Sequence, residues 1–457
     1  MSETADQQAP APARSGPGSW RSRLAALVAK PPLGARTLAI LFVLANLFLC
    51  ADPLVPQLFG HGKGKDYPLW YAVGHLVLTG GGLYPTSGGH PFAFLYPPFA
   101  ALLLAPFSLF GRACSIACID LVNVASWWAA VKLCERLSPA PAARPWWVAG
   151  LPSVLALPFI WDMYDLGQPN LLLLAIMLGG LALLAKDRQW SAGALFAAAA
   201  ALKAFPIAVL PYLVWRRRWR AAASTLGFLA AFLLLAPAPV RGFHRNLAEV
   251  ETWARGMVFS TSEKGFGQRP EQNWGWKNNS LVAITHRYLR PINAEAEDPK
   301  AAPLYVNVAS LSFGGANLAL AAVALAIGAA FAALLPAERR RSPGADAAEY
   351  ALLIVLMTIA SPLARAYYFV WLLFPFTVLA DRAALDPDPQ VRRTLAWALA
   401  ASIGLFTVGV SLGPPHLLQA LGNMFWATAI LAAALAWLMR RSAVAPQAAG
   451  AGRARWL

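Results

Sequence analysis

The chain has 457 residues, of which 58% are hydrophobic and only 13% are charged, and its formal net charge is +16. Soluble globular proteins carry about 25% charged residues, so this composition and a mean hydropathy of +0.50 indicate an integral membrane protein. Nucleic acid is not an expected partner, because the Arg and Lys residues stand in short clusters between apolar segments. Such clusters are typical of cytoplasmic loops that contact anionic membrane lipid.

The two ends of the chain are expected to lie outside the membrane domain. Residues 1–35 are rich in small residues and Pro, which predicts a disordered cytoplasmic tail. The membrane domain is expected over 36–440, and a second cytoplasmic tail over 441–457. Because basic residues precede the first apolar helix at 36–56, that helix should begin inside, and the loop 57–95 should lie outside.

That first outer loop contains an acid followed by an aromatic run, from Lys65 to Tyr71. Apolar residues recur at helical spacing from Asp66 to Gly80, which predicts an amphipathic helix lying in the membrane interface. An acid at the membrane surface, beneath an aromatic shelf, is a candidate general base. The neighbouring Lys63 and Lys65 leave open a plain solvated charge cluster.

Further apolar stretches follow, each a candidate to cross the bilayer as a helix or as a half-helix. They lie at about 96–111, 113–137, 146–162, 170–185, 190–216, 220–240, 306–335, 349–363, 367–381, 393–412 and 419–440. Together with the first helix they predict an all-α polytopic membrane protein with about 11 to 13 transmembrane or half-membrane helices. Pro206 and Pro211 should break one stretch into two half-helices.

The expected topology leaves one parity problem. Three apolar stretches separate Asp66 from Gly167, and both residues are expected outside. One of the three therefore does not cross, and the two candidates are 96–111 and 146–162. The longest extramembrane region, 241–305, is also expected outside, and its aromatic residues favour a lid packed on the membrane face.

Polar residues at the ends of apolar segments are the next candidates for a site. Gln168 and Asn170 precede a leucine run, where they could bond sugar hydroxyls from a helix N-terminus. The alternative is ordinary capping of that helix by Asp165 or Asn170. Lys203 lies at the tip of the broken pair of half-helices, deep in the membrane domain. A lysine at that depth needs an anionic partner such as a phosphate. Otherwise its side chain extends so that the ammonium lies at the membrane surface.

Two polar patches lie late in the sequence. The first, at the end of the long outer loop, contains Asn279, His286 and Arg287. The second is the turn that carries Arg365 and Tyr367. A guanidinium at this turn could clamp a phosphate bidentately, although Arg with two Tyr is also an ordinary interfacial anchor.

In order and spacing, these motifs resemble glycosyltransferase family 87, the polyprenyl-phosphate-mannose-dependent α-mannosyltransferases of the GT-C superfamily. The resemblance runs from about residue 40 to 440. It is carried by Asp66 to Tyr71, Gly80 to Tyr84, Tyr96-Pro97-Pro98, Gly167-Gln168-Pro169-Asn170, Ala192-Gly193, Lys203 to Pro206, Arg217-Arg218-Trp219-Arg220, Asn278 to Leu281 and Ser361-Pro362. Two departures are Tyr367-Tyr368, where many relatives have His-His, and Asn279, where Gln is usual.

The resemblance implies a GT-C-type fold in the cytoplasmic (inner) membrane, with its active site on the outer face. It implies that Asp66 is the general base of an inverting transfer from a polyprenyl-phosphate-linked sugar, most often mannose, to a glycolipid or glycan acceptor. Lys203 and Arg365 would stabilise the leaving phosphate. Substrate contacts are expected from Tyr71, Tyr96, Gln168, Asn170, Lys203, Asn279, His286, Arg287, Arg365 and Tyr367. No cofactor or metal is implied. The alternative is a polytopic transporter or lipid flippase without transferase activity.

Overall fold

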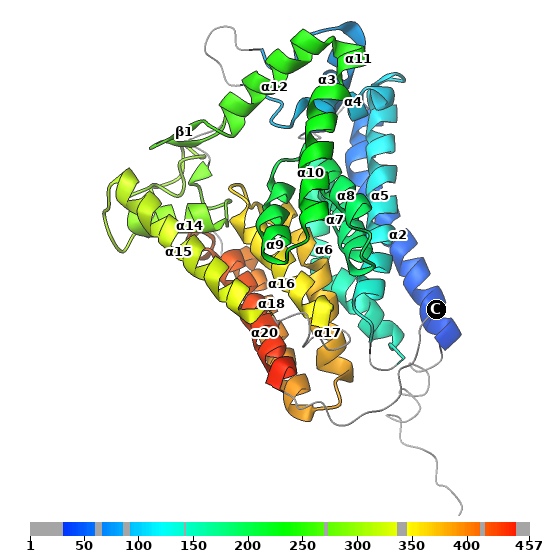
Figure 1. Cartoon of the computed structure of the whole chain (residues 1–457), viewed down its shortest axis with the longest axis vertical. Coiled ribbons are helices and arrows are strands. Elements are labelled where there is room, and N and C mark those ends of the chain that lie inside the picture. Colours follow the sequence, from blue (N-terminus) through cyan, green and yellow to red (C-terminus); the bar gives the residue numbers. More distant parts are fainter. Residues whose placement is uncertain are drawn as a thin grey trace, which may run out of the picture.

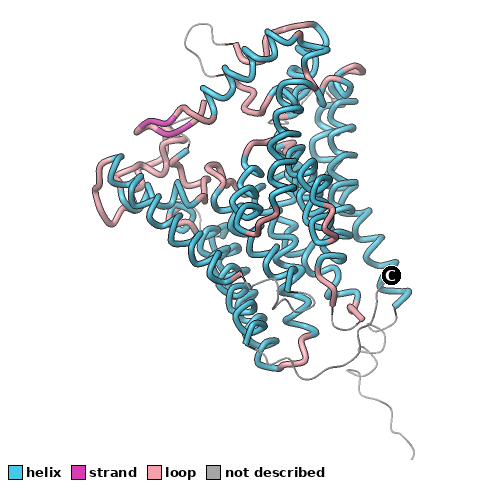
Figure 2. Tube along the Cα trace, viewed as in Figure 1, coloured by secondary structure: helices cyan, strands magenta, loops and turns pink. Residues whose placement is uncertain are grey.

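The structure is a computed structural model that describes residues 31–59, 66–85, 92–140, 143–268, 273–335, 345–411 and 416–444. Helices dominate these residues (Figure 2). Eight of the helices described are long and apolar enough to cross a membrane, and three shorter apolar helices accompany them. The prediction of an all-α polytopic membrane protein is confirmed.

Figure 1 shows the helices of the bundle and the elements that connect them, coloured in chain order. The bundle comprises α2 (Pro31–Leu58), α5 (Arg112–Leu137), α6 (Trp146–Leu166), α7 (Asn170–Ala185), α8 (Gln189–Leu202), η3 (Phe205–Ala208), α9 (Val209–Trp215), α10 (Trp219–Ala230), η4 (Ala231–Leu235), α15 (Phe313–Leu334), α16 (Ala345–Ala360), η6 (Ala366–Leu372), α17 (Leu373–Leu385), α18 (Pro389–Ser411) and α20 (Asn423–Val444). The connecting elements are α3 (Tyr67–Thr79), α4 (Pro98–Leu104), η2 (Pro106–Ser108), α11 (Ala238–Arg241), α12 (Phe243–Met257), β1 (Thr261–Ser262), β2 (Gly265–Phe266), α14 (Leu281–Leu289) and α19 (Leu417–Ala420).

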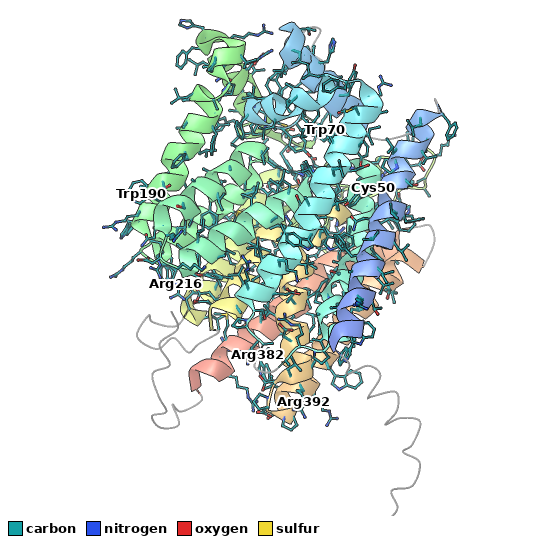
Figure 3. All side chains as sticks on the ribbon, turned by 90° about the vertical axis from the view of Figure 1, so that its right-hand side faces the viewer. Cys50, Trp70, Trp190, Arg216, Arg382 and Arg392 are labelled. Carbon is teal, nitrogen blue, oxygen red and sulfur yellow. The ribbon has the colours of Figure 1, made fainter. Side chains whose placement is uncertain are left out.

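Four of the connecting helices gather at one end of the bundle. In Figure 1, α3, α4, α11 and α12 lie together at the end opposite the beginning of α2. Figure 3 shows Trp70 of α3 at that end, whereas Arg382 and Arg392 lie at the other. This arrangement agrees with the positive-inside assignment of the loops.

The parity problem has a structural answer. The stretch 96–111 forms only the seven-residue α4 and the three-residue η2. At 1.5 Å per residue α4 is about 10 Å long, far short of the roughly 30 Å hydrocarbon core. The stretch 146–162, the other candidate, belongs to the 21-residue α6, which is long enough to cross.

Several element boundaries differ from the sequence prediction. Helix α2 begins at Pro31, ahead of the expected Arg36, whereas residues 1–30 lie outside the described residues. The chain breaks at Lys203, between α8 and η3, but the expected break at Pro211 was wrong. Pro211 lies in the first turn of α9, where its missing N–H costs no helical hydrogen bond. The described C-terminal helix continues to Val444, past the expected end of the domain.

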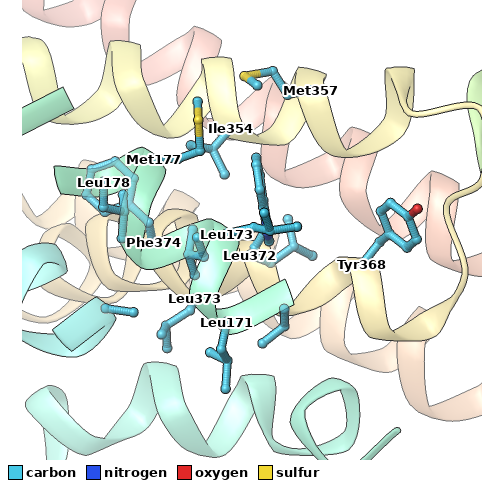
Figure 4. Close-up of a cluster of buried hydrophobic side chains, with 14 of the residues drawn as sticks. Leu171, Leu173, Met177, Leu178, Ile354, Met357, Tyr368, Leu372, Leu373 and Phe374 are labelled. Carbon is cyan, nitrogen blue, oxygen red and sulfur yellow. The ribbon is translucent and has the colours of Figure 1, made fainter. Parts of the chain in front are cut away.

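The core forms where α7, α16 and the η6–α17 segment meet. Figure 4 shows Leu173 and Met177 of α7 beside Ile354 of α16 and Leu372 of η6. These four side chains are fully buried. Each fully buried Leu, Ile or Met side chain contributes about 1.5–3 kcal/mol relative to exposure in water, and within lipid the gain comes from packing instead.

Two ion pairs tie the basic end of the bundle together. The Arg144 guanidinium contacts the Asp381 carboxylate at 2.5 Å, and Arg216 binds Glu349 with both side chains buried. Because an unpaired buried charge is strongly unfavourable, these pairs fix the positions of α6 and α9 against α17 and α16.

The loop that follows α2 forms the predicted helix, which buries one of its faces. Helix α3 ends at Gly80, whose φ of +74° is the left-handed conformation that glycine adopts freely at a helix end. The segment that begins with α11 contacts this helix, because the Arg241 guanidinium donates to the carbonyls of Leu76 and Gly81. In α12, the Trp253 indole donates to Leu95 O at 3.0 Å. The segment that contains α11 and α12 therefore packs on the first loop.

Candidate active site

Asp66 lies at the beginning of α3, half-buried, and its side chain does not cap that helix. Instead, Gln168 donates from Nε2 to an Asp66 carboxylate oxygen at 2.5 Å. Gln168 belongs to the short junction between α6 and α7, far away in sequence. The fold thus brings the candidate base to the polar turn that the sequence singled out.

Gln168 also connects Asp66 to two further candidates. The Tyr96 hydroxyl donates to Gln168 Oε1 at 2.6 Å, and Lys203 Nζ donates to the same oxygen at 3.2 Å. Lys203 Nζ also donates to Asn170 Oδ1 at 3.1 Å. We refer to Asp66, Tyr96, Gln168, Asn170 and Lys203 as the Asp66 network. Its members come from four separate segments of the chain.

Lys203 lies within a set of aromatic rings. Its ammonium is 4.2 Å from the ring centroid of Tyr368, 5.0 Å from that of Tyr367 and 5.2 Å from that of Tyr96. Cations at these distances are attracted to the ring faces. Lys203 therefore directs its charge into the site, and its side chain is half-buried rather than extended to a surface.

Asn170 joins the network to η6. Its Nδ2 donates to the carbonyl of Tyr367 at 3.1 Å, and its own carbonyl accepts from the Trp371 indole at 3.0 Å. Asn170 does not cap α7, because Pro169 stands at the N-cap and the Asn170 amide donates to Tyr367 O. The Tyr367-Tyr368 turn is thereby brought beside Lys203.

The junction between α6 and α7 is shaped by Gly167. This residue has φ +72° and closes α6 in the left-handed conformation, with Gln168 N donating back to Met163 O at 2.9 Å. A side chain at Gly167 would meet the Tyr67 ring at 3.0 Å. The Trp70 indole donates to the Gly167 carbonyl at 2.7 Å. Helix α3 therefore sits directly against the turn that presents Gln168.

His286 and Arg287, both on α14, have contacts of a different kind. The Arg287 guanidinium is fully buried and donates to four backbone carbonyls, those of Trp274, Gly275, Asn278 and Ala420. His286 stacks on Trp274 with ring centroids 4.4 Å apart, and burial lowers the pKa of its imidazole to about 4. Among the described contacts, no hydrogen bond joins either residue to the Asp66 network.

The neighbouring amides Asn278 and Asn279 differ sharply. Asn278 bonds the 361–364 turn twice, since its Nδ2 donates to Pro362 O at 2.9 Å and its Oδ1 accepts from Ala364 N at 3.0 Å. The Asn279 side chain makes only long contacts, at 3.4 and 3.5 Å, and its buried Oδ1 has no hydrogen-bond partner among the described residues. Asn279 remains a predicted substrate contact, and Asn278 docks the turn.

Arg365 and Tyr71 lie at the edges of the site. Arg365 precedes η6 and forms an ion pair with Glu297 at 3.1 Å, while Lys277 approaches the same carboxylate at 2.8 Å. Tyr71, half-buried on α3, lies under the Arg112 guanidinium at 5.9 Å. Neither residue is hydrogen-bonded to the Asp66 network in the part of the chain that the structure describes.

Comparison with known proteins assigns the chain to a family. A sequence model described as glycosyltransferase family 87 matches residues 94–362, more than half of the chain. The chain belongs to glycosyltransferase family 87. The resemblance found in the sequence is thereby confirmed.

This family 87 protein has curated relatives in mycobacteria. It is 29% identical over 44% of its length to a polyprenol-phosphate-mannose-dependent alpha-(1-2)-phosphatidylinositol mannoside mannosyltransferase of Mycobacterium tuberculosis, covering 52% of that protein. It is also 34% identical, over 31% of its length, to a polyprenol-phosphate-mannose-dependent alpha-(1-2)-phosphatidylinositol pentamannoside mannosyltransferase of Mycobacterium tuberculosis. That match covers 32% of the relative. The matches thus span about half or less of these relatives.

Among solved structures, the family 87 protein is similar to ArnT from Cupriavidus metallidurans bound to undecaprenyl phosphate. The sequence identity is 14% and the TM-score is 0.39, and the match covers 88% of this chain and 77% of ArnT.

Proposed function

We propose that this protein is a membrane glycosyltransferase that moves a sugar from a polyprenyl-phosphate donor to a glycolipid or glycan acceptor. Mannose is the proposed sugar, because the relatives named above depend on polyprenol-phosphate-mannose. The single observation that carries the proposal is the Asp66 network, in which an acid, two amides and a lysine meet in a chain of family 87.

Asp66 is the proposed general base. Its carboxylate takes the proton of an acceptor hydroxyl as the oxygen attacks the anomeric carbon of the donor sugar. A new C–O bond forms while the bond from the anomeric carbon to the phosphate oxygen breaks, with inversion. Gln168 donates to the Asp66 carboxylate, and this hydrogen bond orients the carboxylate within the site.

Lys203 is the proposed partner of the leaving phosphate. The polyprenyl phosphate gains negative charge as the glycosidic bond breaks, and an ammonium fixed by Gln168 and Asn170 would stabilise that charge. A phosphate ester is a good leaving group, so no strong general acid is required. Arg365 would also bind the leaving phosphate once its ion pair with Glu297 is broken.

We propose that the reaction takes place at the outer face of the cytoplasmic membrane. Support comes from Figure 3, where Arg216, Arg382 and Arg392 lie toward the end opposite Trp70. The Asp66 network gathers at the ends of α6 and α8 and the beginning of α7. Charges at helix ends favour a transferase over a transporter, whose polar residues concentrate midway along spanning helices.

The donor class is tested with membranes that contain the wild-type protein. We expect labelled mannose to reach the lipid or glycan fraction from polyprenyl-phosphate-mannose and not from a nucleotide-activated mannose. Membranes with equal amounts of the Asp66→Asn variant are the control and should show no transfer from the lipid donor. Transfer from the nucleotide sugar alone would overturn the proposal.

A further inference from the structure

Asp120 is an acid inside a membrane helix. It lies about 12 Å along α5 from the first residue of that helix, and its side chain is 2% exposed. An acid in the interior of a membrane helix costs about 2.5–3.5 kcal/mol on insertion scales, so such residues have a partner and mark a functional position. Asp120 is not among the candidate residues that the sequence motifs indicate.

The partner of Asp120 is Tyr67. The buried Tyr67 hydroxyl donates to Asp120 Oδ1 at 2.7 Å and lies 3.0 Å from the carbonyl oxygen of Tyr164. The second carboxyl oxygen of Asp120 is buried without a hydrogen-bond partner among the described residues. The side chain therefore has one described bond, and that bond holds Tyr67.

Tyr67 is the first residue of α3 and directly follows Asp66. Its ring lies against Gly167, where an added Cβ would come within 3.0 Å of the ring carbons. Gly167 in turn precedes Gln168, which donates to Asp66. A shift of the Tyr67 ring would move the candidate base and its amide partner relative to each other.

We propose that Asp120 is a positioning residue that acts through Tyr67 to hold Asp66 against Gln168. The inference rests on the proposed function for the catalytic meaning of Asp66, but the geometry of the pair is testable without it. The positioning role needs an acceptor oxygen at residue 120 and no charge. Asp120→Asn should therefore preserve the position of Asp66 against Gln168, whereas Asp120→Leu should disturb it. Tyr67→Phe should disturb it in the same way as Asp120→Leu.

The geometry is measured by cross-linking. In a full-length background without the four native cysteines, Asp66→Cys and Gln168→Cys are joined by a short bis-methanethiosulfonate reagent. We expect equal yields with Asp120 and Asp120→Asn. The yield should fall about threefold or more in Asp120→Leu and in Tyr67→Phe, since each loses the hydrogen bond between Tyr67 and Asp120. An unchanged yield in both would overturn the proposal, whether or not the protein transfers sugar.

The activity measurement separates positioning from other roles. With Asp66 and Gln168 intact, Asp120→Leu should lower kcat about tenfold or more at an unchanged donor KM, because misplacing a reacting group slows the chemical step. Asp120→Asn should stay within about twofold of wild type. If Asp120→Leu fails to accumulate, Tyr67→Phe, which removes one oxygen, carries the same expectation. A loss in Asp120→Asn as large as in Asp120→Leu would show that the charge or proton matters, and would overturn the positioning role.

Discussion

At the scale of single residues, Lys203 is held among hydrogen-bond acceptors and aromatic rings. Lys203 has Gln168 and Asn170 within hydrogen-bond distance and the Tyr368 ring centroid at 4.2 Å. The oxygens that accept hydrogen bonds from this ammonium belong to neutral amides. A donor phosphate would place a negative charge in direct contact with the ammonium, which makes this residue the most informative one after Asp66.

Lys203→Met keeps an unbranched side chain that is one atom shorter and removes the charge. We expect kcat/KM for the lipid-linked donor to fall about 10- to 100-fold, the effect of losing one or two hydrogen bonds from a charged group. Steady-state transfer in detergent measures the change. The control is Lys186→Met, at the exposed turn after α7, which should leave kcat/KM unaltered. A kcat/KM for Lys203→Met equal to that of the wild type would show that Lys203 does not act on the lipid-linked donor.

His286 provides a prediction for the pH dependence of stability. Burial lowers the pKa of its imidazole to about 4, whereas an unfolded histidine titrates near 6.5. The unfolded chain binds the extra proton between these values, so the contribution of His286 is complete above about pH 6.5 and is lost as the pH falls toward 4.

We therefore expect the thermal midpoint in detergent to fall between pH 6.5 and pH 4. The fall should be smaller in His286→Gln, whose amide can still reach Asn317, the partner of His286 at 3.1 Å. Both proteins are compared by thermal unfolding across that range. An equally steep fall in the variant would show that other groups cause it.

At the scale of elements, α14 and the 361–364 turn act as one unit because of Asn278. Its side chain bonds Pro362 O and Ala364 N, and the Ser280 hydroxyl caps α14 by accepting from Ala283 N. The turn leads directly into η6, which carries Tyr367 and Tyr368 beside Lys203. The Asn-x-Ser-Leu motif thus connects the outer region to the site through the backbone.

The adjacent amides offer a matched pair of substitutions. Asn278→Ala leaves buried backbone groups unpaired and should lower the free energy of unfolding on the order of 3 kcal/mol. Asn279→Ala, whose side chain has only long contacts, should change stability little and should raise the acceptor or donor KM if it contacts substrate. Chemical or thermal unfolding and steady-state kinetics are measured on both. Equal destabilisation by the two substitutions would contradict this division of roles.

Sequence patterns predicted some elements well and others poorly, for physical reasons. Helix α3 was predicted because its apolar residues recur at helical spacing, and its end because three glycines follow. The stretch 96–111 was ambiguous because composition does not reveal where Pro98 and Pro106 restart a short helix. The β1–β2 hairpin was not predicted, since two residues per strand give no alternation to detect.

At the scale of the whole molecule, Arg382 and Arg392 lie at the end of the bundle opposite α3, α4, α11 and α12. Prediction of this polarity was possible because Arg and Lys positions in short loops determine orientation. The meeting of Asp66, Tyr96, Gln168, Asn170 and Lys203 was predictable only through the family resemblance. Asp120 was missed because a single acid within an apolar helix gives no sign in sequence of the side chain that it contacts.

Orientation is tested by labelling from outside the cell. In a background without native cysteines, Thr261→Cys in the β1–β2 hairpin should react with a membrane-impermeant maleimide in intact cells. Lys186→Cys, at the other end of α7 from the site, should react only after the membrane is opened. Labelling of Lys186→Cys in intact cells, with Thr261→Cys protected, would reverse the topology and place the site inside.

The central claim is that Asp66 removes the acceptor proton, and one measurement tests it most directly. Purified wild-type protein and Asp66→Asn are each saturated with polyprenyl-phosphate-mannose, and sugar transfer to acceptor is followed in a single turnover, with donor affinity measured on the same samples. We predict donor affinity within about threefold of wild type and a transfer rate lower by about 10²-fold or more, the usual contribution of a general base. An Asp66→Asn variant that transfers sugar at the wild-type rate would contradict the account.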